Sequence, residues 1–220
     1  MANVKIQGNA SGSGVLTITA PNTDSTRTIT LPDSTGTLLD TTNGGLQLLS
    51  TQTISGNAAS VIFTGLSSTY DHYMIVMDNV TGETDGAFLW GRASDDSGSS
   101  FEADAADYHY AYTQVSESGS LYTEHAEASD NSTKFIFVGS GPGNASGETL
   151  SGQIMLSQHD ATGNRLHVAL IGANWYGTAN ILITGRGGGS AFVAAGYDQF
   201  QLLMSTGGIN GTFSIYGVTK

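Results

Sequence analysis

The chain has 220 residues, 39% of them hydrophobic, which is enough for one large domain, or one domain plus an arm, with an adequate core. Only 12% of the residues are charged and 30 are glycine, a composition that lacks the residues of long solvated helices and favours an all-β protein with many turns. The net charge of −12, with seven Lys and Arg in total, argues against nucleic acid and anionic membranes as partners.

The first fourteen residues lack the apolar core of a signal peptide, and no apolar run approaches the length of a membrane helix. We therefore expect neither secretion by the general route nor membrane insertion. The chain has no cysteine, so neither disulfides nor thiolate metal sites can form. Twelve of the nineteen acids and one base, Arg92, lie between Asp78 and Asp130, a concentration typical of a solvated surface.

Residues 1–46 form the first predicted unit, a short β arm. Its strand-like segments are Val15–Thr19, Arg27–Leu31 and Thr37–Leu39, separated by turn residues. So few apolar side chains cannot offset the ordering entropy of about forty residues, at roughly 1–2 kcal/mol each. The arm therefore needs a partner surface, which could be the second domain, the arms of sister chains or a larger assembly. We expect the interface to contain Ile29, Leu31, Leu38 and Leu39.

Residues 47–220 form the second predicted unit. Residues 41–45 are expected to be a hinge, and Leu46–Leu49 either a short turn of helix or the start of this unit. Ten later segments have strand character, at 60–64, 73–77, 87–90, 108–113, 134–138, 153–157, 166–173, 180–184, 199–204 and 212–216. They predict an antiparallel, jelly-roll-like two-sheet β-sandwich. The predicted core is Val61, Phe63, Ile75, Met77, Phe88, Trp90, Phe135, Phe137, Ile154, Leu156, Val168, Leu170, Ile181, Ile183, Leu202, Phe213 and Ile215.

Three segments are expected to be loops. Phe101–Asp107 has helical character but is short and acidic, which favours a loop element over a core helix. The glycine-rich stretches 139–143 and 185–190 resemble phosphate-binding loops, but neither ends in Gly-Lys-Ser/Thr or opens a helix. We interpret both as flexible connections between strands.

Motifs for catalysis or metal binding are absent from the sequence. The five histidines are not spaced as ligand pairs, and we expect His109 and His167 to serve in packing. The acids at 95, 96, 102, 104 and 107 do not follow an EF-hand pattern, and there is no Gly-x-Ser-x-Gly motif. We therefore nominate no catalytic, metal or cofactor residue, expect no cofactor, and predict that the protein is not an enzyme.

Aromatic residues are the remaining candidates for binding. Tyr108, Tyr110 and Tyr112 alternate along one strand, so their rings share one face of a sheet. We expect core or intersubunit packing for them rather than an exposed platform for a ligand. The other candidates are Tyr122, Trp175, Tyr176 and Tyr197.

Two stretches resemble a known class of proteins. Residues 12–43, "GSGVLTITAPNTDSTRTITLPDSTGTLLDTTN", resemble the T-I-T-L-P-x-S-T-G-T-L segment of tail-fibre and other virion structural proteins of tailed bacteriophages. Residues 209–220, "INGTFSIYGVTK", are similar to the closing strand of many such proteins. The resemblance covers about 45 of the 220 residues. It implies a non-enzymatic virion component, commonly a homotrimer, that attaches to the particle through its N-terminal part and projects a β domain.

The resulting expectation is a short-fibre or decoration protein of a phage virion. Its expected partners are copies of itself, other virion proteins of the capsid, portal or tail, and, as a further candidate, host-surface glycan. The alternative within the virion is a capsid decoration or cement protein without a receptor role. We rank below these a carbohydrate-binding module and a glycan-degrading tail protein. A secreted adhesin would need an export signal, and none is visible.

Overall fold

The computed structural model describes residues 11, 24, 45–118, 121–137, 141–157, 165–176, 181–193 and 195–218. The predicted arm, residues 1–46, lies outside them except for residues 11, 24, 45 and 46, and so do the four predicted interface residues Ile29, Leu31, Leu38 and Leu39. The strands are β1 (Leu46–Ala58), β2 (Val61–Thr64), β3 (His72–Gly82), β4 (Leu89–Ser94), β5 (Tyr108–Ser118), β6 (Leu121–Ser132), β7 (Phe135–Ile136), β8 (Leu150–Ser157), β9 (His167–Tyr176), β10 (Ile181–Ala191), β11 (Gln199–Met204) and β12 (Ile209–Val218).

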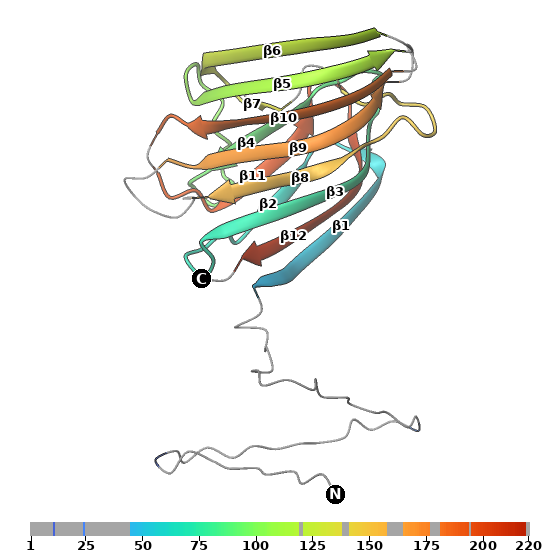
Figure 1. Ribbon diagram of the computed structural model, residues 1–220. Helices are drawn as coiled ribbons and strands as arrows, with labels where there is room; N and C mark the ends of the chain where they lie inside the picture. The colour runs from blue at the N-terminus through green and yellow to red at the C-terminus, as the bar shows by residue number, and fades with distance from the viewer. Residues whose placement is uncertain are drawn as a thin grey trace, which may run out of the picture. The chain divides into compact units, whose positions relative to one another are not determined.

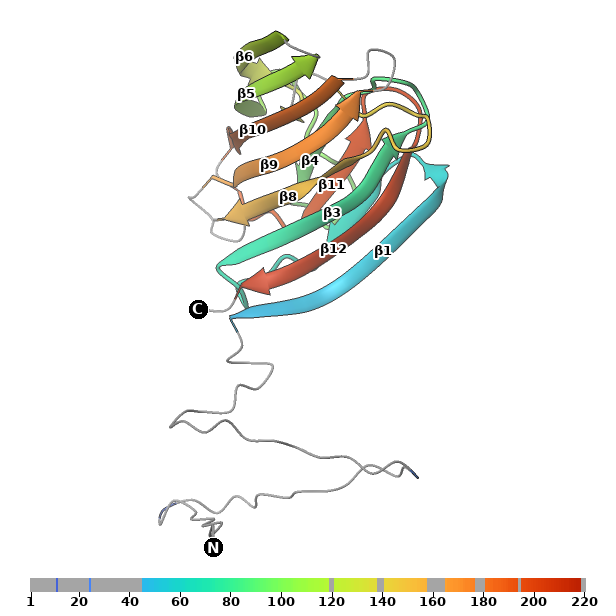
Figure 2. The ribbon, with the colours of Figure 1, turned by 45° about the vertical axis from the view of Figure 1, so that its right-hand side comes forward.

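Two antiparallel sheets make up the described fold, with the smaller sheet drawn behind the larger one in Figure 1. The larger sheet has eight strands in the order β1-β12-β3-β8-β9-β10-β5-β6, and the smaller has four in the order β2-β11-β4-β7. The two strands nearest the C-terminus, β11 and β12, each pair with two strands from the first half of the chain, as Figure 2 shows for β12 between β1 and β3. The prediction of an all-β protein with two antiparallel sheets is confirmed. Across these residues, no helix has the length and apolarity to cross a membrane.

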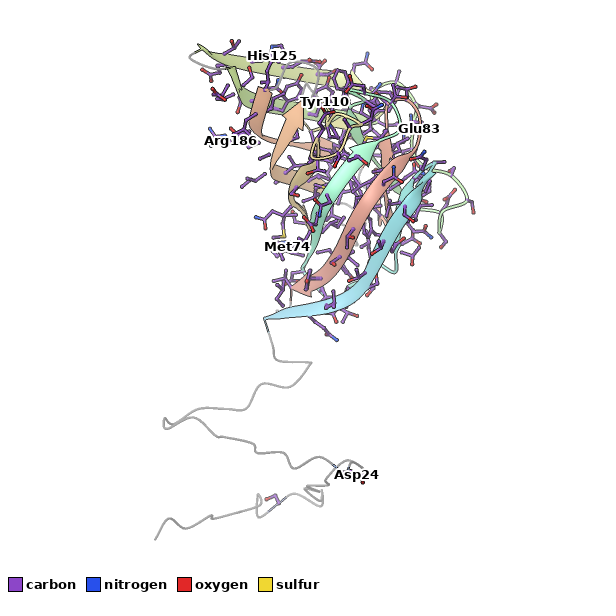
Figure 3. The ribbon with its side chains drawn as sticks, turned by 90° about the vertical axis from the view of Figure 1, so that its right-hand side faces the viewer. Asp24, Met74, Glu83, Tyr110, His125 and Arg186 are labelled. Carbon is purple, nitrogen blue, oxygen red and sulfur yellow. The ribbon has the colours of Figure 1, made fainter. Side chains whose placement is uncertain are left out.

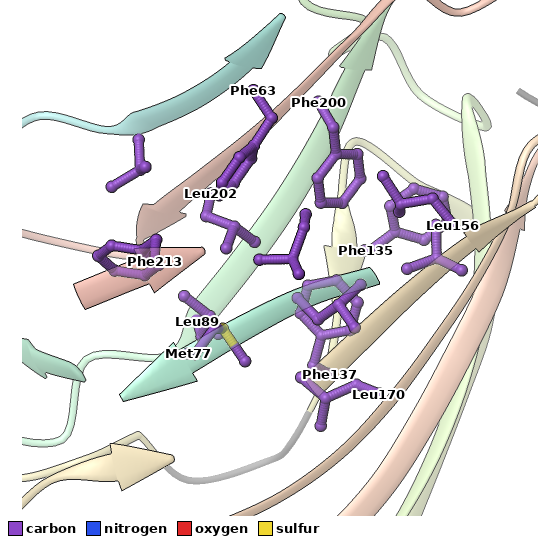
Figure 4. Close-up of a cluster of buried hydrophobic side chains, with 14 of the residues drawn as sticks. Phe63, Met77, Leu89, Phe135, Phe137, Leu156, Leu170, Phe200, Leu202 and Phe213 are labelled. Atoms are coloured by element: carbon purple, nitrogen blue, oxygen red, sulfur yellow. The ribbon is translucent and has the colours of Figure 1, made fainter. Parts of the chain in front are cut away.

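The core lies between the facing sides of the two sheets (Figure 4). Successive residues of a strand point to opposite faces, and β12 accordingly alternates buried and half-buried side chains along its whole length. The ring of Phe135 lies 4.5 Å from that of Tyr108 and 6.3 Å from that of Phe200, between centroids, which is the usual range for packed aromatic pairs. All predicted core residues are buried except Phe88, Trp90 and Ile181.

The prediction was wrong about which face of β4 is buried. Leu89 is fully buried, while Phe88 before it is 37% exposed and Trp90 after it is half-buried beneath the Lys134 ammonium, 4.3 Å from the ring centroid. The reason is Gly91, which shares the face of Leu89: a Cβ there would lie only 2.8 Å from the ring of Phe200. The inward face of β4 must therefore carry a small residue at this point. Ile181 is half-buried because it is the first residue of β10.

The prediction of a flexible loop at residues 185–190 was also wrong. These residues lie inside β10 and pair with β9 on one side and β5 on the other. Gly187 and Gly189 are needed because β7 and the residue after it pass directly beneath: a Cβ on Gly187 would lie 2.4 Å from the carbonyl oxygen of Phe137. Gly141–Gly143, from the other glycine-rich stretch, have no regular secondary structure.

Two strands were not predicted at all, β1 and β6, which form the two edges of the larger sheet. Leu46–Leu49 is the start of β1, so the helical turn, one of the two expectations for this segment, is wrong. Phe101–Asp107 forms bends and a turn without a helix, as expected for a loop element.

Candidate interaction surface

We call the side of the eight-stranded sheet that faces away from the smaller sheet the outer face. The pairing register aligns its side chains in rows that cross all eight strands. The first central row, from β1 to β6, is Leu48, Tyr216, Met74, Met155, Ala169, Gly188, Ala111 and Ala128. The second is Thr51, Ser214, Val76, Gln153, Ile171, Arg186, Thr113 and Ala126.

These two rows are almost free of charge. Their one charged residue is Arg186, although the chain as a whole carries a net charge of −12. Figure 3 shows Met74 and Arg186 on the same side of the sheet, and Tyr110 on the side of the core. Long runs of uncharged side chains on an exposed sheet mark a surface suited to association.

A shallow trough of about 690 Å³ lies on the outer face where β9, β10, β5 and β6 run side by side. Its floor is made by the small residues Ala111, Ala128 and Ala169, because short side chains leave a depression between longer neighbours. Ile171, whose side chain is 62% exposed, and Arg186 line the trough beside them. Two further hollows, of about 630 and 540 Å³, share residues with it and continue it along the strands.

On the opposite face of the same strands, Tyr110 and Tyr112 share one carboxylate. Their hydroxyls donate to Oε1 and Oε2 of Glu127 at 2.9 and 2.7 Å, and their rings are stacked with 6.3 Å between centroids. Burial, followed by the bond to Glu127, raises the pKa of both phenols, that of Tyr110 to about 12. The same two bonds lower the pKa of Glu127. The carboxylate thus holds the edge strand β6 to β5.

The three alternating tyrosines are packed rather than presented to a ligand. Tyr108, Tyr110 and Tyr112 are all buried, which confirms the expectation of packing for them. The Tyr108 hydroxyl donates to the carbonyl oxygen of Glu102 at 3.0 Å and accepts from the amide of Ala93 at 2.9 Å. Tyr197 is buried as well, and the side chains of Tyr122, Trp175 and Tyr176 lie outside the described residues.

Three histidines fall in one row of the outer face, which sequence spacing had concealed. The row runs His72, Ser157, His167, Ser190 and His109, from β3 to β5. His109 packs as expected, with its ring stacked on Phe192 at 5.2 Å, but His167 is exposed, so packing was the wrong expectation for it. In the described parts of the chain, no three His, Cys, Asp or Glu side chains lie close enough to hold a metal ion. His159 lies outside those parts.

The acidic loop after β4 is organised by its own hydrogen bonds. Asp96 accepts from the amide and hydroxyl of Ser100 at 2.9 and 2.7 Å and from the hydroxyl of Ser94 at 2.8 Å. These donors hold the pKa of Asp96 at about 2, so the carboxylate caps a turn. Burial, and then the nearby carboxylates led by Asp95, raise the pKa of Glu102.

The two edges of the larger sheet differ in their protection. β6 carries Glu124, His125, Glu127 and Asp130, and charged residues are the usual protection of an edge strand against pairing. β1 has thirteen residues and no charge, and it exposes Leu46, Leu48 and Leu49 by 50%, 53% and 39%. An exposed apolar edge of this kind is suited to contact with another chain.

No protein-family model, no curated protein and no solved structure matches this chain. The outer face and the β1 edge are therefore the features from which its function has to be argued. Sequence reasoning missed the outer face because its residues come from eight strands that only the register brings together. It missed the β1 edge because β1 was not predicted as a strand.

Proposed function

We propose that the chain is a non-enzymatic structural protein of a tailed-bacteriophage virion, of the short-fibre or decoration type. In this proposal the protein is a homotrimer, residues 1–46 attach it to capsid, portal or tail proteins, and residues 47–220 project outward. Attachment to host-surface glycan is part of the proposal, but the buried Tyr108, Tyr110 and Tyr112 are not proposed as its platform.

The observation that carries the proposal is the outer face of the larger sheet. Fifteen of the sixteen residues in its two central rows are uncharged in a chain of net charge −12. An acidic protein that works as a free, dispersed monomer would gain solubility from acids on so wide a face. A subunit of an assembly instead keeps such a face free for contact. The two stretches at 12–43 and 209–220 supply the class of assembly, through their resemblance to phage virion proteins.

The test is to locate the protein in the particle. Phage particles from a lysate are banded, washed and labelled with an antibody raised against residues 47–220, with an antibody against the major capsid protein as the control. We expect the protein to remain with washed particles and the label to sit at repeated positions. Label at the tail or portal end indicates a fibre, and label on the capsid lattice indicates a decoration protein. Protein that is made during infection but absent from washed particles would contradict the proposal.

A further inference from the structure

We propose that copies of the chain join by seating the β1 edge of one copy, through Leu46, Leu48 and Leu49, in the outer-face trough of the next copy. This inference rests on the proposed homotrimer and names the surfaces that form it.

The β1 edge supplies the projecting part of the contact. The register aligns Leu46 with Val218 and Leu48 with Tyr216, which places both leucines on the outer face, at the border of the sheet. Each is at least half exposed, and removing such a side chain from water is worth about 25 cal/mol per Å² of apolar surface. Since β1 carries no charge, burying this edge does not require a charged group to lose its water.

The trough supplies the receiving part. Ala111, Ala128 and Ala169 leave room above the backbone, and Ile171 offers an apolar wall that is 62% exposed. A leucine side chain therefore has both the space and the apolar contacts it needs there. Two charged residues, Arg186 and Glu127, are among those that line the trough. The Glu127 carboxylate is bonded to the hydroxyls of Tyr110 and Tyr112 on the opposite face of the sheet. The long stem of Arg186 can lie against an apolar neighbour while its guanidinium stays in water.

The charge distribution identifies the occupant as a second copy. In a chain of net charge −12, two copies repel each other through most contacts. Pairing through β6 would bring Glu124 and Asp130 of one copy near those of the other. The β1 edge carries no acid, and the one acid that lines the trough, Glu127, has its carboxylate bonded to tyrosine hydroxyls on the opposite face. The two surfaces can therefore meet across two copies at a lower electrostatic cost than two β6 edges.

The two surfaces lie at opposite ends of one sheet, which dictates the kind of assembly. Leu48 and Ala128 end the same row, seven strand spacings apart, or about 34 Å at roughly 4.8 Å per spacing. One copy cannot fill its own trough with its own edge. The contact is therefore heterologous: the edge of one copy meets the trough of the next. An open row of copies keeps an unused trough at one end and an unused edge at the other until the row closes into a ring. A ring of three is the closed form that agrees with the proposed homotrimer.

The experiment uses the full chain and three substitutions at exposed apolar positions. Leu48→Glu alters the edge, Ile171→Glu alters the trough, and Val193→Glu is the control, because Val193 is 50% exposed and belongs to neither surface. In sedimentation velocity, we expect wild type and Val193→Glu to be trimers and each of the other two variants to be a monomer. A 1:1 mixture of the two monomeric variants retains one intact contact and should form a dimer and nothing larger.

A crosslinking measurement makes the same test without disrupting the contact. Because the chain has no cysteine, Leu48→Cys with Ala128→Cys introduces the only two thiols. A short bismaleimide should link this variant into covalent trimers, while Leu48→Cys with Val193→Cys should stay monomeric on a denaturing gel. If the glutamate variants stay trimeric and these thiols do not crosslink, the inference is overturned while the homotrimer stands. A monomeric wild type would contradict the homotrimer itself.

Discussion

Glu127 shows how one side chain fastens a sheet edge. β6 has a neighbour on one side only, so its attachment depends on β5. The two tyrosine hydroxyls donate to both oxygens of the Glu127 carboxylate, and the imidazole Nε2 of His125 lies 4.0 Å from Oε2. Hydrogen bonds to an ionised acceptor are stronger than those between neutral groups. The cluster thereby couples the stability of this edge to the ionisation of one carboxylate.

The first prediction concerns this cluster and its pH dependence. Tyr112→Phe removes one hydroxyl donor and should lower the free energy of unfolding by about 1 kcal/mol at neutral pH. The folded protein lowers the pKa of Glu127, so its contribution is present above the ordinary glutamate value of 4.5 and is lost as pH falls through the folded value. The difference between variant and wild type should therefore shrink on acidification.

Urea unfolding at a series of pH values measures this difference. Tyr216→Phe is a matched control, because Tyr216 lies on the outer face, away from Glu127. A loss of the same size at low pH as at neutral pH would show that the hydroxyl acts through packing and not through the carboxylate.

At the scale of elements, β10 shows why a glycine-rich run can be a strand. Its Gly187 and Gly189 face the core at the place where β7 passes beneath the sheet. The Phe135 ring lies 2.8 Å from a Cβ built on Gly189, closer than real side chains approach each other. Glycine is therefore required by the close approach of the second sheet, and the outward positions of β10 contribute to the trough.

The second prediction tests this account of β10. Gly187→Ala places a methyl group 2.4 Å from the carbonyl oxygen of Phe137, which is backbone and cannot rotate away. We expect a loss of about 1–3 kcal/mol in the free energy of unfolding, by overpacking. Gly56→Ala is the matched control, because nothing lies within 4 Å of its added Cβ. Equal stabilities of the two variants in thermal unfolding would contradict the close packing of β7 under β10.

How much the sequence could predict depended on whether an element had a local apolar signal. The ten strands with such runs exist, and most of their buried residues were identified because alternation predicts one buried face. β6 was not predicted because Glu124, Glu127 and Asp130 give it the composition of a loop. Residues 185–190 of β10 were not predicted as strand because most of them are glycines. The buried face of β4 was assigned wrongly because the run at 87–90 is apolar at every position and does not alternate. Only contact with Phe137 and Phe200 decides which face is buried.

The candidate surface was out of reach of sequence reasoning for a related reason. Leu48, Ala169 and Ala128 are more than forty residues apart in the chain, and only strand order brings them into one row. The interface predicted from sequence was instead the arm, at Ile29, Leu31, Leu38 and Leu39, and this stays a prediction because those residues lie outside the described ranges.

At the scale of the whole molecule, acids are absent from the two central rows of the outer face. The described acids from Asp95 to Asp107 lie in a loop with its own hydrogen bonds, and others protect the β6 edge. The central rows of the outer face and all of β1 contain no acid. This distribution leaves an uncharged surface on the larger sheet, which agrees with the self-association that we propose.

The most direct test of this account is the molar mass of the purified full-length chain in solution at micromolar concentration and physiological salt, measured by light scattering or sedimentation equilibrium. The account predicts three times the chain mass of 22.7 kDa, unchanged over a tenfold dilution. A mass equal to that of a single chain over the whole concentration range would contradict it.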